Sequence, residues 1–220
     1  MGSLGQDPDE QPAHPVTLNP YIIDKYEVST EQYAQCVQQH KCTPAHYDDG
    51  ACTIWDGKAF LRVTVPKALR SPKSPVVCVS WRQAQEYCLA QGKRLPTEAQ
   101  WEHAAKGGRG NAYSWGDQTP SAATCTQAVN RAPKPCGSFT ANGYGLFDMT
   151  GNVWEWTADR YQKDYYAVAE SINPTGPPAG LYRVVRGGGW YSNAGQLRIT
   201  NRHWFEPSYS EVSIGFRCAK

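Results

Sequence analysis

The chain has 220 residues and a formal net charge of +2, with 22 Lys and Arg against 20 Asp and Glu. This length suits one domain of ordinary size. The near-neutral charge and the lack of a basic run argue against nucleic acid as a partner, and no apolar stretch approaches the ~20 residues that span a bilayer.

The N-terminal residues 1–14 are polar and lack the apolar core of a signal peptide. We therefore expect a flexible lead-in, followed by a single domain over 15–220, since no break in composition divides the rest of the chain. Residues 15–29 carry β-branched and aromatic side chains in partial alternation, which predicts one or two strands.

A helix is expected to begin after Ser29 or Thr30, followed by a long loop over 41–76 that is rich in Pro, Gly and Asp. Ser80 and Thr97 are each followed three residues later by a glutamine, the pattern of a capping box. This pattern predicts helices that end near Gly92 and Gly107. Beyond Gly107 the sequence indicates short strands and turns, ending in a strand at "SIGFRCAK".

The chain contains eight cysteines and no CxxC motif, which argues against structural zinc and thioredoxin-like chemistry. We expect four disulfides, and hence a periplasmic, cell-surface or secreted protein. The alternative is a set of buried thiols in a cytosolic protein.

Motifs from Gly92 onward occur in a recognisable order. They are "GKRLPTEAQWEHAAKGG", "YSWGD", "NGYGLFDMTGNVWEWTAD", "RVVRGGGW" and "IGFRC". Together they resemble the formylglycine-generating-enzyme family, also called the sulfatase-modifying-factor family, over residues 15–219. The resemblance implies an α+β, C-type-lectin-like fold with little regular secondary structure, two main helices and a small twisted antiparallel sheet.

The resemblance also implies a disulfide between Cys88 and Cys218. Proximity in sequence suggests that Cys36 pairs with Cys42 and Cys125 with Cys136, which leaves Cys52 with Cys78.

Asp148 and Glu155 lie close together among aromatic residues and glycines, and three interpretations compete for them. They could form an acid–base pair, accept backbone hydrogen bonds in a turn, or bind calcium through oxygen ligands. The resemblance favours one calcium ion, held by the side chains of Asp148 and Glu155 and the carbonyl oxygens of Gly151 and Val153. A second calcium site is not expected. Trp154 and Trp156 are interpreted as core residues.

Enzymes of the family that the chain resembles use two cysteines that bind copper, between "RGG" and "GFRC". Here this interval, 189–215, contains no cysteine, and the two positions fall near Ala194 and Ile199. We therefore expect neither copper nor catalytic residues, because neither side chain is a soft ligand or a nucleophile. The five histidines form no HxxxH or HxH pattern.

The segment 190–213 instead combines Tyr and Trp with Ser and Asn, a composition typical of binding loops. The alternative is that these residues fill the core, but interleaved charges favour a solvated surface. The expected ligand-binding residues are Trp190, Tyr191, Ser192, Asn193, Arg198, Arg202, His203, Trp204, Phe205 and Tyr209.

The sequence thus predicts a non-catalytic domain that binds a protein or another extracellular ligand. The composition of 190–213 also resembles a family branch, the retroelement-diversified variable proteins. The alternatives are an oxidase or other modifying enzyme with a rearranged site, or a sensor or scaffold domain of a larger protein such as a kinase.

Overall fold

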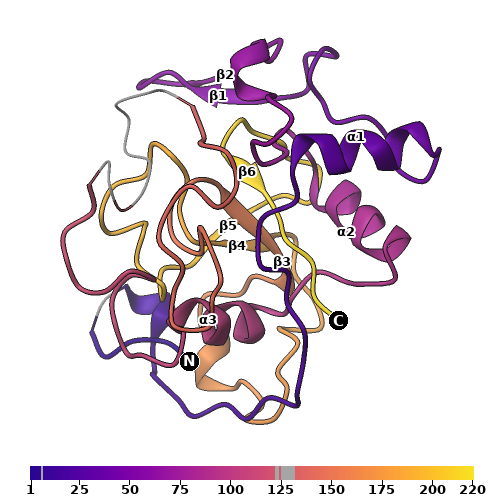
Figure 1. Cartoon of the computed structure of the whole chain (residues 1–220). Helices are drawn as coiled ribbons and strands as arrows, with labels where there is room; N and C mark the ends of the chain where they lie inside the picture. The colour runs from indigo at the N-terminus through magenta and orange to yellow at the C-terminus, as the bar shows by residue number, and fades with distance from the viewer. Residues whose placement is uncertain (6, 122–123, 125–131) are drawn as a thin grey trace.

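The computed structural model describes residues 1–5, 7–121, 124 and 132–220. It contains three helices, two small sheets and long connecting segments (Figure 1). The expected α+β fold with little regular secondary structure is therefore confirmed.

Each of the three α-helices begins at a capping box, which the sequence had indicated for the second and third of them. Helix α1, Thr30–Gln38, is capped by Ser29, α2, Trp81–Ala90, by Ser80, and α3, Glu98–Lys106, by Thr97. In all three the capping side chain accepts the backbone N–H three residues on, where a glutamine side chain returns the bond. Helix α3 ends at Gly107, whose φ of 56° suits a residue without a Cβ.

The central sheet has the strand order β5-β4-β3-β6. Strand β3, Trp154–Arg160, pairs antiparallel with β4, Arg183–Arg186, and parallel with the short β6, Ile214–Gly215. Strand β5, His203–Phe205, pairs antiparallel with β4 and forms one edge. Trp154 and Trp156 are buried with Phe216 between this sheet and α2, which confirms their assignment to the core.

Two parts of the chain differ from the expected secondary structure. Residues 15–29 form isolated β-bridges but no continuous strand, because their backbone hydrogen bonds go to separate residues of 216–220 and of other segments. The expected loop over 41–76 contains the hairpin of β1, Thr53–Trp55, and β2, Phe60–Arg62. Asp56 stabilises its turn by accepting the N–H groups of Lys58 and Ala59, both at 2.8 Å.

Three disulfides tie these segments together. Cys36–Cys42, Cys52–Cys78 and Cys88–Cys218 pair as expected, and the last closes a separation of 130 residues. The predicted Cys125–Cys136 pair falls on Cys125, which lies outside the described residues; Cys136 bonds to no described cysteine.

The expected lead-in, 1–14, packs against the domain in its described part. Its short 3-10 turn, Pro8–Glu10, buries Glu10 completely, and the Glu10 carboxylate accepts a hydrogen bond from Arg198 at 2.7 Å. The backbone N–H of Gly2 also reaches Glu102 on α3, at 2.9 Å. The segment and the domain thus share a charged interface, which composition alone did not indicate.

Candidate functional site: two carboxylates and an aromatic surface

Glu155 on β3 is part of a buried ion pair. Its Oε1 and Oε2 accept hydrogen bonds from Nη2 and Nε of Arg217, at 2.7 and 2.8 Å. The indole of Trp101 donates a third bond to Oε2, at 2.9 Å. Both charged side chains are at most 1% exposed, so the pair compensates two charges that would each be costly to bury alone.

Asp148 lies in the turn before β3 and has a positive φ of 58°. Its Oδ2 accepts the N–H of Gly137, whereas its Oδ1 is buried without a hydrogen-bond partner among the described residues. Burial raises the pKa of Asp148.

A third buried carboxylate, Glu27, was not identified from the sequence. Its Oε1, like Oδ1 of Asp148, has no hydrogen-bond partner among the described residues. Its Oε2 accepts a bond from Asn152, and burial together with the charge of Asp148 raises the pKa of Glu27.

These contacts bear on the three interpretations of the carboxylates. Asp148 and Glu155 both accept hydrogen bonds, as a structural role requires. Calcium is also compatible, because the unpartnered oxygens of Asp148 and Glu27 are hard donors that a cation would satisfy. Glu155 could join only by sharing an oxygen that already accepts a hydrogen bond. Within the described ranges, no group of three or more His, Cys, Asp or Glu residues suits a metal ion.

Four of the ten expected ligand-binding residues have structural contacts. Trp190 is buried and its indole donates to the carbonyl oxygen of Val212 at 3.1 Å, and the Ser192 hydroxyl accepts the N–H of Gly189 at 3.0 Å. Arg202 is 4% exposed and pairs with Glu98 on α3, at 2.8 Å. Arg198 pairs with the buried Glu10, as described above.

Three other expected residues form part of an exposed aromatic surface. Phe205 stacks on Tyr209 with ring centroids 4.5 Å apart, and His203 meets Phe205 at 4.8 Å. The row continues onto the hairpin, where Phe60 lies 6.1 Å from Tyr209 and Trp55 lies 4.9 Å from Phe60. We call Trp55, Phe60, His203, Phe205 and Tyr209 the aromatic strip.

Exposure distinguishes this strip from the core. Phe60 is 52% exposed and Trp55 41%, while the three side chains from 203–209 are partly buried. Burial lowers the pKa of His203 and so favours its uncharged imidazole. Large aromatic side chains that remain exposed together mark interaction sites.

The remaining expected residues lie apart from the strip. Trp204 packs on Tyr161 and Tyr182, because neighbours along a strand point to opposite faces of the sheet. The hydroxyl of Tyr191 accepts a bond from Ser213, and Asn193 is exposed in a turn with Gln196.

Sequence reasoning missed the contribution of the hairpin to the strip. The signal was present: "TIWDGKAFLRV" places Asp-Gly between two runs of β-branched and aromatic residues. The abundance of Pro and Gly around it favoured a loop.

The positions expected for the lost cysteines offer no reactive side chain. Ile199 is fully buried, and Ala194 contributes only its carbonyl oxygen, which accepts the hydroxyl of Tyr113 at 3.2 Å. Cys136 lies elsewhere, and burial together with the charges of Glu27 and Asp148 raises its pKa. A thiol in such surroundings is a poor nucleophile, because the thiolate is disfavoured.

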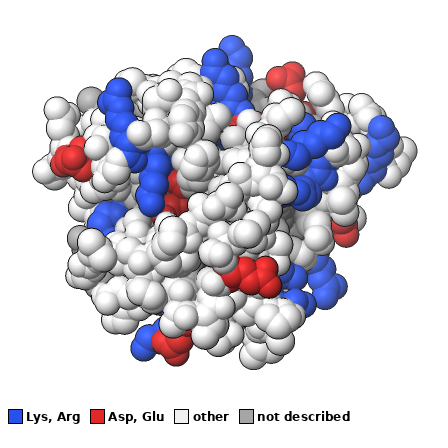
Figure 2. Space-filling view, turned by 90° about the horizontal axis from the view of Figure 1, so that it is seen from below, with Lys and Arg blue, Asp and Glu red and all other residues white. Residues whose placement is uncertain are grey.

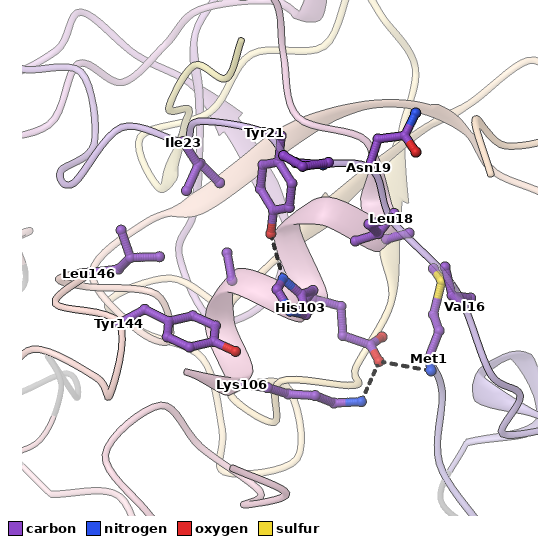
Figure 3. A pocket seen from close by; sticks show the side chains of 14 residues that line it. Met1, Val16, Leu18, Asn19, Tyr21, Ile23, His103, Lys106, Tyr144 and Leu146 are labelled. Atoms are coloured by element: carbon purple, nitrogen blue, oxygen red, sulfur yellow. Dashed lines mark hydrogen bonds and ion pairs between the residues drawn. The ribbon is translucent and has the colours of Figure 1, made fainter. Parts of the chain in front are cut away.

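A cavity of about 540 Å³ lies far from the strip, against α3 (Figure 3). Its walls include Leu18, Ile23 and Leu146, and Tyr21 and His103 project into it with the hydroxyl 2.7 Å from Nδ1. Helix α3 and the hairpin occupy opposite ends of the view in Figure 1.

The charges on one face of the molecule are dispersed. Figure 2 shows Lys and Arg in separate small groups, with Asp and Glu between them and wide uncharged areas. This face therefore lacks the continuous basic surface that nucleic acid requires. None of the described helices is both long and apolar enough to cross a bilayer.

Comparison with known proteins relates this geometry to a family. A serine/threonine-protein kinase, pkn1, of Chlamydia caviae is 36% identical and is matched by 100% of this chain over 36% of its own length. The formylglycine-generating enzyme of Streptomyces coelicolor is 34% identical, with 96% of this chain matching 81% of it. The inactive C-alpha-formylglycine-generating enzyme 2 of Mus musculus is 32% identical, with coverage of 96% and 78%.

Among solved structures, PvdO from Pseudomonas aeruginosa superposes with a TM-score of 0.80 at 27% identity, covering 97% of this chain and 85% of that one. The chain spans about a third of the length of the kinase-named relative, and most of the length of the enzyme-named one. The family of the sulfatase-modifying factor enzyme 1-like domain matches residues 1–220, and the chain belongs to this family.

Proposed function

We propose that this chain is a non-catalytic binding domain that holds a protein ligand on the aromatic strip. The observation that carries the proposal is the continuous row of partly exposed aromatic rings from Trp55 to His203. Tyr, Trp and Phe side chains supply large contact area at low entropic cost, and they dominate the binding energy of protein interfaces. Tyr191 and Asn193 would extend the surface with hydrogen-bonding groups.

The contacts of the arginines narrow the expected binding set. Arg198 and Arg202 are paired with Glu10 and Glu98, so recruiting them to a ligand would break the ion pairs that these arginines form with two buried carboxylates. Trp190 and Ser192 have their polar atoms engaged as well. We therefore assign a structural role to these four residues.

An oxidase or other modifying enzyme is the second candidate. The enzyme-named relatives favour it. Against it stand the absence of cysteine from 189–215, the methyl and aliphatic side chains of Ala194 and Ile199, and the raised pKa of Cys136. The relative named inactive is consistent with a family that also contains members without this activity.

We also propose one calcium ion beside Asp148. Asp148 Oδ1 and the carbonyl oxygens of Gly151 and Val153 would bind it, and Glu155 would contribute a fourth ligand by sharing an oxygen with Arg217. When bound, the ion would neutralise Asp148 and fix the turn before β3. It would supply structural charge and no reaction.

Three described disulfides favour an oxidising compartment, so we propose a periplasmic, cell-surface or secreted location. The match to about a third of the kinase-named relative is compatible with a binding domain carried on a longer protein. We also propose that the segment 190–213 is diversified by a retroelement. A genome locus without a template repeat and a reverse transcriptase would exclude this.

The test compares binding by matched surface variants. The protein with its disulfides intact would be used to capture a partner protein from extracts of cell-surface proteins. The purified partner would then be titrated onto each immobilised variant by surface plasmon resonance. Phe60→Ser combined with Tyr209→Ser should weaken binding about 30-fold, the scale of an aromatic hot spot. Leu181→Ser, which alters a side chain that is 79% exposed, serves as the control and should bind as wild type does. Equal affinity for all three proteins would contradict the proposal.

A further inference from the structure

The outer edge of the hairpin presents unpaired backbone. In the sheets formed by the described residues, β2 has one neighbour, β1. On its other side β1 adjoins 210–212: Thr53 N donates to Ser210 O, and Val212 N donates to Thr53 O, both at 3.0 Å. The hairpin is thus anchored on one side and open along β2.

The register shows which backbone groups point outward. Residues opposite each other in an antiparallel pair alternate between exchanging both hydrogen bonds and exchanging none. Thr53 uses its groups towards 210–212, so its partner Arg62 must direct its own N–H and C=O away from β1. Phe60, two residues earlier, has the same orientation. The edge therefore offers up to two N–H donors and two C=O acceptors.

The side chains beside this edge form a chemical pattern. Phe60 and Arg62 lie on the face that carries Trp55 and Tyr209, because residues two apart share a face. Leu61 is on the opposite face, and all three residues of β2 are exposed. Among the described residues, the ion pairs found leave Lys58 and Arg62 without an acidic partner.

We propose that β2 binds an extended peptide of the partner as an additional strand. The peptide would place a large apolar side chain against Phe60 and an acidic side chain against Arg62, two positions apart. Backbone bonds to Phe60 and Arg62 would supply affinity, and the alternating side chains would supply specificity. This inference rests on the proposed function and names the chemistry of its ligand.

A second copy of this chain is a less suitable occupant. The edge carries Lys58 and Arg62, so two copies that pair along β2 would bring four basic side chains together. An acidic peptide would relieve that repulsion. Self-association is therefore an outcome of the test that would overturn the proposal.

The first experiment follows the fluorescence anisotropy of a labelled peptide, fluorescein-Thr-Ser-Glu-Val-Phe-Thr-Ser-amide, as the intact protein is titrated into it. Two variants carry single backbone N-methyl groups, one on the Val amide and one on the Phe amide. Adjacent amides point in opposite directions, so only one methyl group should block pairing, with about tenfold weaker binding for the loss of one bond. Equal affinities of the two methylated peptides would overturn strand addition.

The second experiment exchanges charge. Arg62→Glu should weaken binding of this peptide about fivefold. Replacing the Glu of the peptide with Lys should restore the affinity of this variant. Sedimentation should show a monomer at each concentration used. A charge exchange with no effect, or a dimer that excludes the peptide, would contradict the proposal.

The outcomes separate the two proposals. If the Phe60 and Tyr209 substitutions weaken binding of the protein partner while both methylated peptides bind with equal affinity, strand addition is refuted and the aromatic binding surface is supported. If those variants leave the partner unaffected, the proposed function itself fails.

Discussion

The charged cluster around α3, in which Arg186 and Arg202 pair with Glu98 and Glu102, and the aromatic strip both draw on the segment 190–213, but they use its residues in opposite ways. In the cluster, Arg202 pairs with Glu98 and is nearly inaccessible to solvent. In the strip, Phe205 and Tyr209 stack on each other and continue to the exposed Phe60. Residues that share a composition typical of binding loops therefore divide into supports and candidate contacts, according to partners far away in the chain.

The largest effect is expected in the buried ion pairs. Arg217→Met should lower the free energy of unfolding by about 3–5 kcal/mol, because it leaves Glu155 buried without its charge partner. Urea unfolding followed by fluorescence measures this change. Arg82→Met, on the exposed face of α2, is the matched control and should stay within about 0.5 kcal/mol. Equal effects would mean that the Arg217–Glu155 pair is not important for stability.

A buried acid that forms no ion pair among the described residues should respond to pH. Burial raises the pKa of Glu211 from 4.5 to about 8. The folded protein therefore holds this proton more tightly, and the resulting stability is present below pH 4.5 and is lost as pH rises towards 8. Glu211→Gln should not show this loss. As pH rises from 5 to 8, its free energy of unfolding should therefore increase by about 3 kcal/mol relative to that of wild type.

Urea titrations at several pH values would measure the Glu211 effect. Glu206→Gln, which alters an exposed carboxylate nearby, is the control. A difference between Glu211→Gln and wild type that does not depend on pH would show that Glu211 ionises normally in the folded protein.

Stabilisation by calcium should depend on Asp148, which has an unpartnered oxygen, more than on Glu155, which is paired with Arg217. At calcium one hundred times its Kd, wild type should gain about 2.7 kcal/mol over protein in chelator, by mass action. Asp148→Asn should lose most of this gain, since Asp148 Oδ1, which has no hydrogen-bond partner among the described residues, is the carboxylate oxygen proposed to bind the ion. Thermal unfolding with calcium, magnesium or chelator makes the measurement. No calcium-dependent shift in wild type would refute the calcium proposal.

The smallest effect on stability is expected in the strip. Phe60→Ser should change the free energy of unfolding by no more than about 0.5 kcal/mol, because the ring is 52% exposed. The same variant should still weaken partner binding. A large loss of stability would instead place Phe60 in the core and undermine the comparison of the two regions.

Local signals in the sequence predicted the helices well. Ser80 and Thr97 cap helices as expected, because a capping box is complete within four residues. The family resemblance gave Cys88–Cys218, and proximity gave Cys36–Cys42.

Features that depend on distant residues could not be derived in this way. The partner of Arg198 is Glu10, 188 residues away, and the partner of Arg202 is Glu98, 104 residues away. Composition therefore could not show which arginines are buried. Trp55 and Phe60 were missed because their link to Tyr209 depends on where the hairpin packs.

The most direct test of a binding role in place of oxidation is the state of the cysteines. Intact mass would be measured after denaturing alkylation, with and without reduction, on protein first exposed to Cu(I). We predict that all eight cysteines resist alkylation until reduction, with Cys136 protected by the expected pair with Cys125, and that no copper is retained. Two cysteines that alkylate without reduction, in protein that retains copper, would contradict this account and support the enzyme.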